Sequence, residues 1–222
     1  FYDNSPTYLT QALTASLARL RLNRIPLYYL HWPDGVTPIE EAVEAMDACR
    51  REGLIGAIGL SNVSAEQLQR ACRVAPISAV QVQYSLVDRA AAEALLPIAK
   101  RHHVPLITWG SLAQGLLTGK YDEQSTFAAD DRRSRYENFQ GERFRQNLDM
   151  VAHLKPIAAR HQHSPGQTAI RWLLEQQGVG SVLFGAKHPD QVTENLGAID
   201  WSLGTTDEQT LTSQLTQRPR AA

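Results

Sequence analysis

Residues 25–32 read IPLYYLHW, and residues 55–62 read IGAIGLSN. Each is a short, nearly continuous apolar run that ends in polar residues, as expected for a strand covered on both faces. Segments with helical patterns separate these runs from three others, which are ISAVQVQYS at 77–85, VPLITWGS at 104–111 and VGSVLFGA at 179–186. The alternation of strand and helix predicts βαβ units and a parallel sheet of five strands, which is an α/β fold.

Signals for helix starts lie between these runs. Ser5 stands directly before Pro6, which places a capping hydroxyl ahead of a first-turn proline. Three stretches have the spacing of a capping box, in which a Ser or Thr precedes Glu or Gln by three residues. They are TPIE at 37–40, SAEQ at 64–67 and SPGQ at 164–167.

A long polar stretch from Tyr121 to Gln146, rich in Arg, Asp and Glu, follows the fourth run. Connections of this length without secondary structure are usually functional or disordered. Two interpretations stay open, a loop that helps to bind a ligand and a solvated, mobile insertion. From Thr206 onward the sequence is typical of a terminal helix with a frayed tail.

The composition predicts one domain over residues 1–222, because 43% of the residues are hydrophobic and 20% are charged. The net charge of −1, without long runs of one sign, argues against binding to nucleic acid or a membrane surface through bulk charge. No apolar stretch is long enough to cross a bilayer. Cys49 and Cys72 form no CxxC pattern, so we expect reduced thiols in a cytoplasmic protein.

Two architectures fit the strand pattern, an open doubly wound sheet and part of a (β/α)8 barrel. Open sheets that bind dinucleotides usually carry GxGxxG after the first strand, and this sequence has no such motif. The segment GLLTGKY at 115–121 has the wrong spacing for a phosphate loop. A bound nucleotide must therefore be held in another way.

Polar groups collect where the apolar runs end, which is where a parallel barrel carries its functional residues. A histidine such as His31 can polarise a carbonyl oxygen, and Ser, Asn and Gln side chains can hold a planar carboxamide. The face of Trp109 can stack on a heteroaromatic ring, and Lys187 before a helix start can meet a phosphate. Carboxamide, ring and phosphate together describe a nicotinamide nucleotide, although other ligands fit this set.

Simpler interpretations stand beside these. The polar strand ends are either one shared rim site or unrelated loop caps, His31 is either a ligand-facing group or a structural cap, and Trp109 could be plain packing. Trp172 and Trp201 are predicted to pack in the core or at the surface, and residues 167–172 to form a buried helix face. The histidines at 102–103 and at 161 and 163 lie at predicted helix ends without ligand spacing, so we expect solvated turns rather than a metal site.

Five motifs in order resemble the aldo-keto reductase family: HWPD followed by TPIEE, GLSNVS, VQVQYSL, GLLTGKY and FGAKHPDQVTENLGA. The stretch DRRSRYENFQGERFRQN at 131–147 further resembles the bacterial general-stress and inositol-associated group. The resemblance covers nearly the whole chain. It implies a (β/α)8 TIM barrel, an NADPH/NADP+ cofactor and oxidoreductase activity, the reduction of aldehydes and ketones to alcohols by hydride transfer.

Carried over by motif, the resemblance implies that His31 is the active-site histidine, which orients the oxygen of a small-molecule carbonyl substrate. Trp109 corresponds to the aromatic residue that stacks on the nicotinamide ring. The residues implied to hold the nicotinamide carboxamide are Ser61, Asn62 and Gln81.

The resemblance also implies contacts to the rest of the cofactor, with Lys187 favouring NADPH over NADH and Arg133 acting as a clamp. The stretch that wraps the pyrophosphate corresponds to Gly110, Ser111, Leu112, Ala113, Gln114 and Lys120. The adenosine and 2′-phosphate site corresponds to Gly185, Lys187, Gln191, Glu194 and Asn195.

The sequence departs from the family in ways that matter for activity. The catalytic Tyr, Lys and Asp lie on earlier strands, so the chain is expected to be N-terminally truncated, a partial barrel that lacks the first three strands. Such a chain alone is expected to turn over carbonyl substrates far more slowly than a complete relative. Phe184 and Ser111 also stand where the family usually has proline. The alternatives to a reductase are a non-catalytic nucleotide-binding regulatory subunit and an inactive fragment of this fold.

Overall fold

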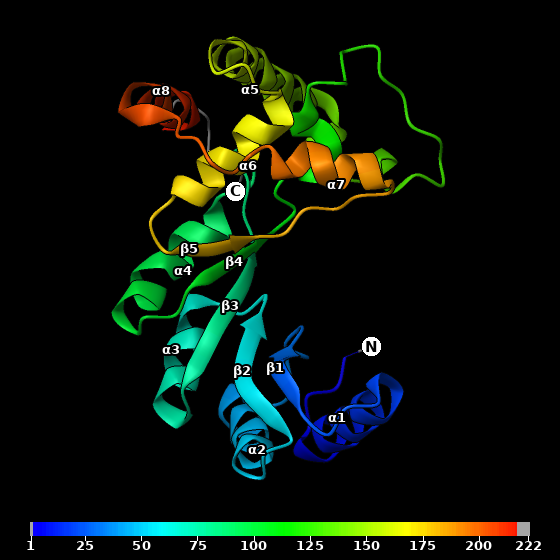
Figure 1. The fold of residues 1–222 in the computed structure, drawn as a ribbon. Coiled ribbons are helices and arrows are strands. Elements are labelled where there is room, and N and C mark those ends of the chain that lie inside the picture. Colours follow the sequence, from blue (N-terminus) through cyan, green and yellow to red (C-terminus); the bar gives the residue numbers. More distant parts are fainter. Residues whose placement is uncertain (1, 217–222) are drawn as a thin grey trace. The chain divides into compact units, whose positions relative to one another are not determined.

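The computed structural model describes residues 2–216 of the chain, so the tail predicted after the last helix lies outside the described residues (Figure 1). The chain divides into two compact units. The first comprises Phe1–Val82 with Ala90–Ile107, and the second comprises Gln83–Arg89 with Thr108–Ala222. A single domain over residues 1–222 remains a prediction.

The first unit alternates helices and strands. In β1, β2 and β3 each strand runs parallel to the next, with Tyr29 opposite Gly59 and Ser61 opposite Gln81. Helices α1 and α2 pack against each other, and so do α2 and α3, and α3 and α4. The elements are α1 (Pro6–Leu20), β1 (Ile25–Leu30), α2 (Ile39–Arg51), β2 (Ile55–Ser61), α3 (Ala65–Val74), β3 (Ile77–Gln83), α4 (Ala90–Arg101) and β4 (Leu106–Trp109), of which β3 and β4 end in the second unit.

The second unit is mostly helical. Helix α6 contacts α5, α7, β5 and the 3-10 segment η1, and its Trp172 and Leu173 are fully buried, as predicted for this helix face. The elements after β4 are η1 (Ala113–Thr118), η2 (Arg132–Ser134), η3 (Glu137–Phe139), α5 (Gly141–Arg160), α6 (Pro165–Glu175), β5 (Val179–Val182), α7 (Pro189–Leu196) and α8 (Gly204–Thr216).

All five predicted strands are confirmed, in the sheet order β1-β2-β3-β4-β5. Within the first unit, the backbone N–H of Val80 donates to Pro105, and within the second unit that of Leu183 donates to Thr108. The inner strands β2 and β3 are largely buried, whereas Leu27 on the edge strand β1 is 37% exposed. The other edge strand, β5, has no buried residue among its four.

Most predicted helix starts are confirmed. Ser5 caps α1, and capping boxes at Ser64 and Ser164 begin α3 and α6. The box predicted at Thr37 is wrong, because α2 begins after Pro38 without a side-chain cap. The hydroxyl of Thr37 donates instead to the carboxylate of Asp34 at 2.8 Å, which competes for that side chain.

The polar stretch predicted from Tyr121 to Gln146 is shorter than expected, because α5 begins at Gly141. Two short 3-10 turns, η2 and η3, also lie within it. The high density of charged residues concealed a helix start, since the apolar face of α5 appears only from Phe144 onward. Among residues 2–216, no helix is both long and apolar enough to cross a membrane.

Candidate functional site

Four of the predicted site residues, all in the first unit, come together near the ends of β1, β2 and β3. The side-chain amide of Asn62 donates to the backbone carbonyl of His31 and to the hydroxyl of Ser61, both at 3.0 Å. Its backbone N–H donates to the carbonyl of Gln81, also at 3.0 Å. His31 itself is exposed, directly after β1. Asn62 therefore links the ends of three neighbouring strands. We call this group, which consists of His31, Ser61, Asn62 and Gln81, the rim.

The geometry of Asn62 gives it a structural task as well as the predicted binding role. Its φ of 57° lies in the left-handed region, which Asn tolerates better than most residues. An amide nitrogen carries two hydrogens, and both are directed to partners within the rim. Donation from this nitrogen to a carboxamide would therefore require one of these bonds to break.

A polar clip that we did not predict holds the loop after β1. Asp34 accepts hydrogen bonds from the backbone N–H groups of Asn4, Val36 and Thr37 at 2.8–2.9 Å, and its own N–H donates to the side-chain oxygen of Asn4 at 2.7 Å. Burial alone would raise the pKa of Asp34, but these bonds hold it well below its usual value. The clip joins the segment before α1 to the loop that carries His31.

In the second unit, the end of β4 is fixed by the buried hydroxyl of Ser111. This side chain is 1% exposed, donates to the carbonyl of Leu183 at 2.7 Å and lies 3.0 Å from the hydroxyl of Thr108. Trp109, the predicted ring-stacking residue, is half-buried, and its carbonyl accepts from the N–H of Tyr84. The hydroxyl of Ser111 thus joins β4 to the segment after β5, and only its backbone is well suited to a cofactor.

The segment from Gly110 to Lys120 turns tightly after β4. Ala113, Gln114 and Gly115 follow one another with positive φ, a conformation that costs energy for residues other than glycine. At Gly115 the φ of 90° favours glycine, whereas space does not require it, because a Cβ would lie at ordinary contact distance, 3.4 Å, from Cε and Nζ of Lys120. The Lys120 ammonium also lies 5.0 Å from the ring centre of Tyr121. Every residue predicted along the pyrophosphate, including Leu112, therefore lies in the segment from Gly110 to Lys120.

Arg133 is held by a cluster that the sequence did not reveal. Its Nε donates to Asp131 at 2.8 Å, a second guanidinium nitrogen bonds the other carboxylate oxygen, and a third bonds the hydroxyl of Tyr121. The guanidinium also lies over the rings of Phe127 and Tyr121, at 5.0 and 5.7 Å from their centres. These contacts link this part of the polar stretch to its neighbours, so they favour an ordered loop over a mobile insertion here.

Charges around Asp131 keep it ionised. The hydrogen bonds from the Arg133 side chain lower the pKa of Asp131 to about 2, and the positive charge of Lys187 contributes in the same direction. The same pairing raises the pKa of Arg133. Asp131 therefore carries a full negative charge near neutral pH, in direct contact with Arg133, which we predicted to contact the cofactor.

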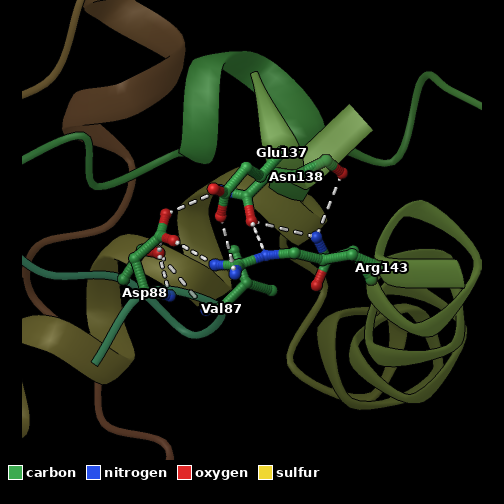
Figure 2. Close-up of polar contacts among 7 residues, drawn as sticks. Val87, Asp88, Glu137, Asn138 and Arg143 are labelled. Atoms are coloured by element: carbon green, nitrogen blue, oxygen red, sulfur yellow. Dashed lines mark hydrogen bonds and ion pairs between the residues drawn. The ribbon is translucent and has the colours of Figure 1, made fainter. Parts of the chain in front are cut away.

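A second network anchors the other end of the polar stretch, as Figure 2 shows. Asp88 accepts from Asn138 at 2.8 Å and from Arg143 at 3.2 Å. Arg143 also donates to the side-chain oxygen of Asn138 at 2.9 Å and to Glu137 at 3.2 Å. Asn147 on α5 donates to Asn138 as well. The loop after β3, the turn η3 and helix α5 are thus joined by one set of charge-assisted bonds.

A hollow of about 570 Å³ opens at the start of α7, lined by Ala186, Lys187, His188, Pro189, Val192 and Thr193. Gln191 accepts from the N–H groups of Lys187 and His188, at 2.6 and 3.3 Å, so its side chain caps the helix. Of the other predicted residues here, Asn195 is buried, and Gly185 and Glu194 are exposed. Lys187 and the positive end of the α7 dipole make this hollow suitable for an anion.

Of the histidines predicted to lie in solvated turns, His161 and His163 instead pack against other side chains. His161 lies 2.8 Å from the carboxylate of Asp207, and the ring of His163 stacks on Trp201 with 4.1 Å between centres. Both side chains are partly buried as a result, which confirms the packing role of Trp201. Within residues 2–216, no group of three or more potential metal ligands gathers at one place.

The predicted residues therefore form two groups, each within its own unit. His31, Ser61, Asn62 and Gln81 share the rim at β1–β3, and Trp109 to Lys120, Arg133 and the residues around α7 belong to the second unit. Asp34, Asp131 and Tyr121 were missed. A local signal existed only for Asp131, two residues before Arg133, because the other contacts depend on the fold.

Comparison with known proteins shows the family to which the chain belongs. The profile of the Aldo/keto reductase family matches residues 2–214. The chain belongs to the aldo/keto reductase family. The family resemblance carried by the five motifs is thereby confirmed.

Several relatives have curated names. The chain is 38% identical to aldo-keto reductase YhdN of Bacillus subtilis over 208 residues, covering 93% of this chain and 63% of that protein. It is 36% identical over 200 residues to Schizosaccharomyces pombe aldo-keto reductase yakc [NADP(+)], covering 89% and 59%. It is 33% identical over 210 residues to the NADH-specific methylglyoxal reductase of Escherichia coli, covering 93% and 64%. Probable subunits beta of plant voltage-gated potassium channels are also related.

Among solved structures, the glycerol dehydrogenase of Gluconobacter oxydans superposes with a TM-score of 0.91 and is 34% identical, covering 98% of this chain and 66% of that chain. The fold is therefore of the TIM barrel type, and the described residues supply five of its strands. The chain spans less than two thirds of the length of these relatives.

Proposed function

We propose that the whole protein reduces an aldehyde or ketone to an alcohol with NADPH. The observation that carries this proposal is the rim at β1–β3, where Asn62 holds the strand ends of His31, Ser61 and Gln81 together. Family membership supports a redox role for this rim. A nicotinamide cofactor, when bound, supplies the hydride.

The chain's own residues would bind and orient the reactants. The exposed imidazole of His31 would donate a hydrogen bond to the substrate oxygen and hold the carbonyl in place. Ser61, Asn62 and Gln81 of the first unit would fix the carboxamide of the nicotinamide. In the second unit, Trp109 is suited to stacking on a heteroaromatic ring. The clip between Asn4 and Asp34 would keep the His31 loop from moving.

The second unit offers groups that fit the rest of a dinucleotide. The hollow at α7 has room for an adenosine, and Lys187 with the helix N-terminus provides the positive charge for a phosphate. Gly185, Gln191, Glu194 and Asn195 would surround this end of the cofactor. The backbone turn from Gly110 to Gln114, together with Lys120, would follow the pyrophosphate, and Arg133 would clamp the cofactor.

The test is oxidation of NADPH by the whole protein with a reactive aldehyde, for wild type and His31→Ala. We expect kcat/KM to fall by about a hundredfold or more in the variant, because a positioned acid–base group contributes about that factor. His102→Ala, at the end of α4, is the matched control and should keep wild-type activity. Equal rates for wild type and His31→Ala would contradict the role of His31.

A regulatory, nucleotide-sensing role is the second candidate, because potassium channel subunits are among the relatives. It predicts that the whole protein binds NADPH tightly and oxidises it negligibly with any of a panel of aldehydes and ketones. Measured turnover with one of them decides for the reductase.

We infer a cytoplasmic protein that acts on small carbonyl compounds rather than on nucleic acid or a membrane. The free thiols of Cys49 and Cys72 support a reducing compartment. Thiol titration of the protein purified without reductant, before and after unfolding, should find both cysteines reduced.

A further inference from the structure

Asp131 is in direct contact with Arg133, one of the cations that would bind the cofactor. Its carboxylate accepts two hydrogen bonds from the Arg133 guanidinium and one from the Arg133 backbone N–H, the latter at 2.9 Å. The charge of Lys187 also acts on it. Two cations and one carboxylate leave a net charge of about +1 where the cations alone would provide +2.

We propose that Asp131 is a specificity-determining residue that weakens binding of NADPH relative to NADH. The inference rests on the proposed function and concerns the same site. NADPH differs from NADH by the 2′-phosphate, an anion that Arg133 and Lys187 would attract and that a neighbouring carboxylate repels. NADH carries no charge at this position, so the carboxylate affects its binding much less.

The contacts of Arg133 decide the direction of the effect. If Asp131 alone held the guanidinium, its removal would weaken phosphate binding by letting Arg133 move. The guanidinium is also bonded to the hydroxyl of Tyr121 and rests on the rings of Phe127 and Tyr121. Phe127 and Tyr121 pack on each other and on Phe139, which is buried. These contacts keep Arg133 in place when the carboxylate is neutralised.

Relatives of this chain differ in the cofactor for which they are named, one for NADP(+) and one for NADH. A residue that shifts the balance between the two cofactors is therefore chemically reasonable in this family. In this chain the balance would depend on a local charge pair in the polar stretch, in addition to the lysine before α7.

The experiment measures equilibrium binding by calorimetry to the whole protein, with NADPH, NADH and 2′,5′-ADP as probes. We expect Asp131→Asn to bind NADPH and 2′,5′-ADP about two- to fivefold more tightly, the range for one exposed charge interaction. NADH affinity should stay unchanged. The gain should shrink in high salt, which screens exposed charges. Asp131→Ser, which retains a capping oxygen at the start of η2, should behave alike and serves if Asp131→Asn folds poorly.

The matched control is Asp130→Asn, which removes the same charge one residue earlier from an exposed side chain. It should change no affinity. In an Arg133→Gln background, the gain from Asp131→Asn should largely disappear, because the two charges act on each other.

Three results would overturn the inference. Weaker binding of NADPH by Asp131→Asn would mean that Asp131 serves to orient Arg133. An equal gain for NADPH and NADH would mean a general effect on the loop rather than on the 2′-phosphate. If the wild-type protein bound neither dinucleotide, the proposed function itself would fail and this inference with it, a result distinct from the first two.

Discussion

At the scale of single residues, Asn62 does the most to shape the candidate site. Its side chain bonds the rim ends of β1 and β2, its backbone bonds that of β3, and its own backbone is left-handed. Asparagine combines two amide hydrogens with tolerance of positive φ. No other residue type offers both, so substitutions here should reveal the two contributions separately.

We expect Asn62→Ala to lower the free energy of unfolding by about 2–4 kcal/mol, because two hydrogen bonds are lost and alanine strains the left-handed backbone. Asn62→Gly loses the same bonds but relieves the strain, so it should be about 1 kcal/mol more stable than the alanine variant. Urea denaturation measures both. If the glycine variant matched wild type, the amide bonds would contribute nothing to stability.

Asp34 should make stability depend on pH in acid. Its folded pKa is lowered, so its contribution is complete above its unfolded pKa of about 3.9 and is lost as pH falls toward the folded value. We expect Asp34→Asn to be about 1–3 kcal/mol less stable than wild type at pH 7, with the difference narrowing below about pH 4. Denaturant unfolding over this pH range tests it. Glu44→Gln, an exposed acid on α2, should show no such difference.

The sequence predicted cofactor contacts for several residues but could not tell which bonds their side chains make within the protein. Ser111 and Gln191 were predicted as cofactor contacts, yet the first bonds Leu183 and the second caps α7. A hydroxyl or amide looks the same in sequence whether its partner is a ligand or the backbone. The partner is fixed only by the fold, here across 72 residues for Ser111.

At the scale of elements, the polar stretch before α5 is fastened at both ends. The bond from Arg133 to the hydroxyl of Tyr121 holds one end, and the network of Asp88, Asn138 and Arg143 holds the other (Figure 2). Its order thus depends on charge-assisted bonds as well as on the packing of the rings of Tyr121, Phe127 and Phe139. Local opening of the stretch should therefore respond strongly to the loss of one charged partner.

Arg143→Met should speed cleavage by chymotrypsin at the exposed Tyr136 by about tenfold, because α5 then no longer bonds Asp88 and Glu137. Arg145→Met is the matched control, since Arg145 is exposed on the same helix and pairs with Glu142 one turn away. Limited proteolysis followed by mass spectrometry gives both rates. Equal cleavage of the two variants would show that the network does not order the stretch.

Elements with strong periodic signals could be predicted, and those decided by competition could not. The five strands and the capping boxes at Ser64 and Ser164 follow from local pattern alone. The capping box predicted at Thr37 does not form, because its hydroxyl donates to Asp34. The start of α5 was missed because its first turn is polar. The Asp88 network joins residues 50 and 55 positions apart, beyond any local pattern.

At the scale of the whole chain, the two edge strands differ from the inner ones. Leu27 on β1 and Leu183 just after β5 are exposed, whereas Ile58 and Val80 on the inner strands are fully buried. Exposed edge strands with apolar side chains favour association with other chains.

Leu27→Lys should reduce self-association of the 222-residue chain, because a charge on an edge strand opposes pairing with another edge. Tyr8→Lys on α1 is the matched control, since it exchanges a similarly exposed apolar side chain on a helix. Light scattering against concentration should show less association for the first variant only. The same decrease in both would mean that general surface charge, rather than the strand edge, sets the effect.

The order of the sheet follows the order of synthesis, since each strand pairs with the one made just before it. A nascent chain leaving the ribosome could therefore add its strands one after another. The first bonds between strand ends join residues close in sequence, such as His31 and Asn62, which are 31 positions apart. The bond between Ser111 and Leu183 forms later, because 72 positions of the chain separate the two residues. The slow step of assembly should then be the docking of β5, after α5 and α6 have formed.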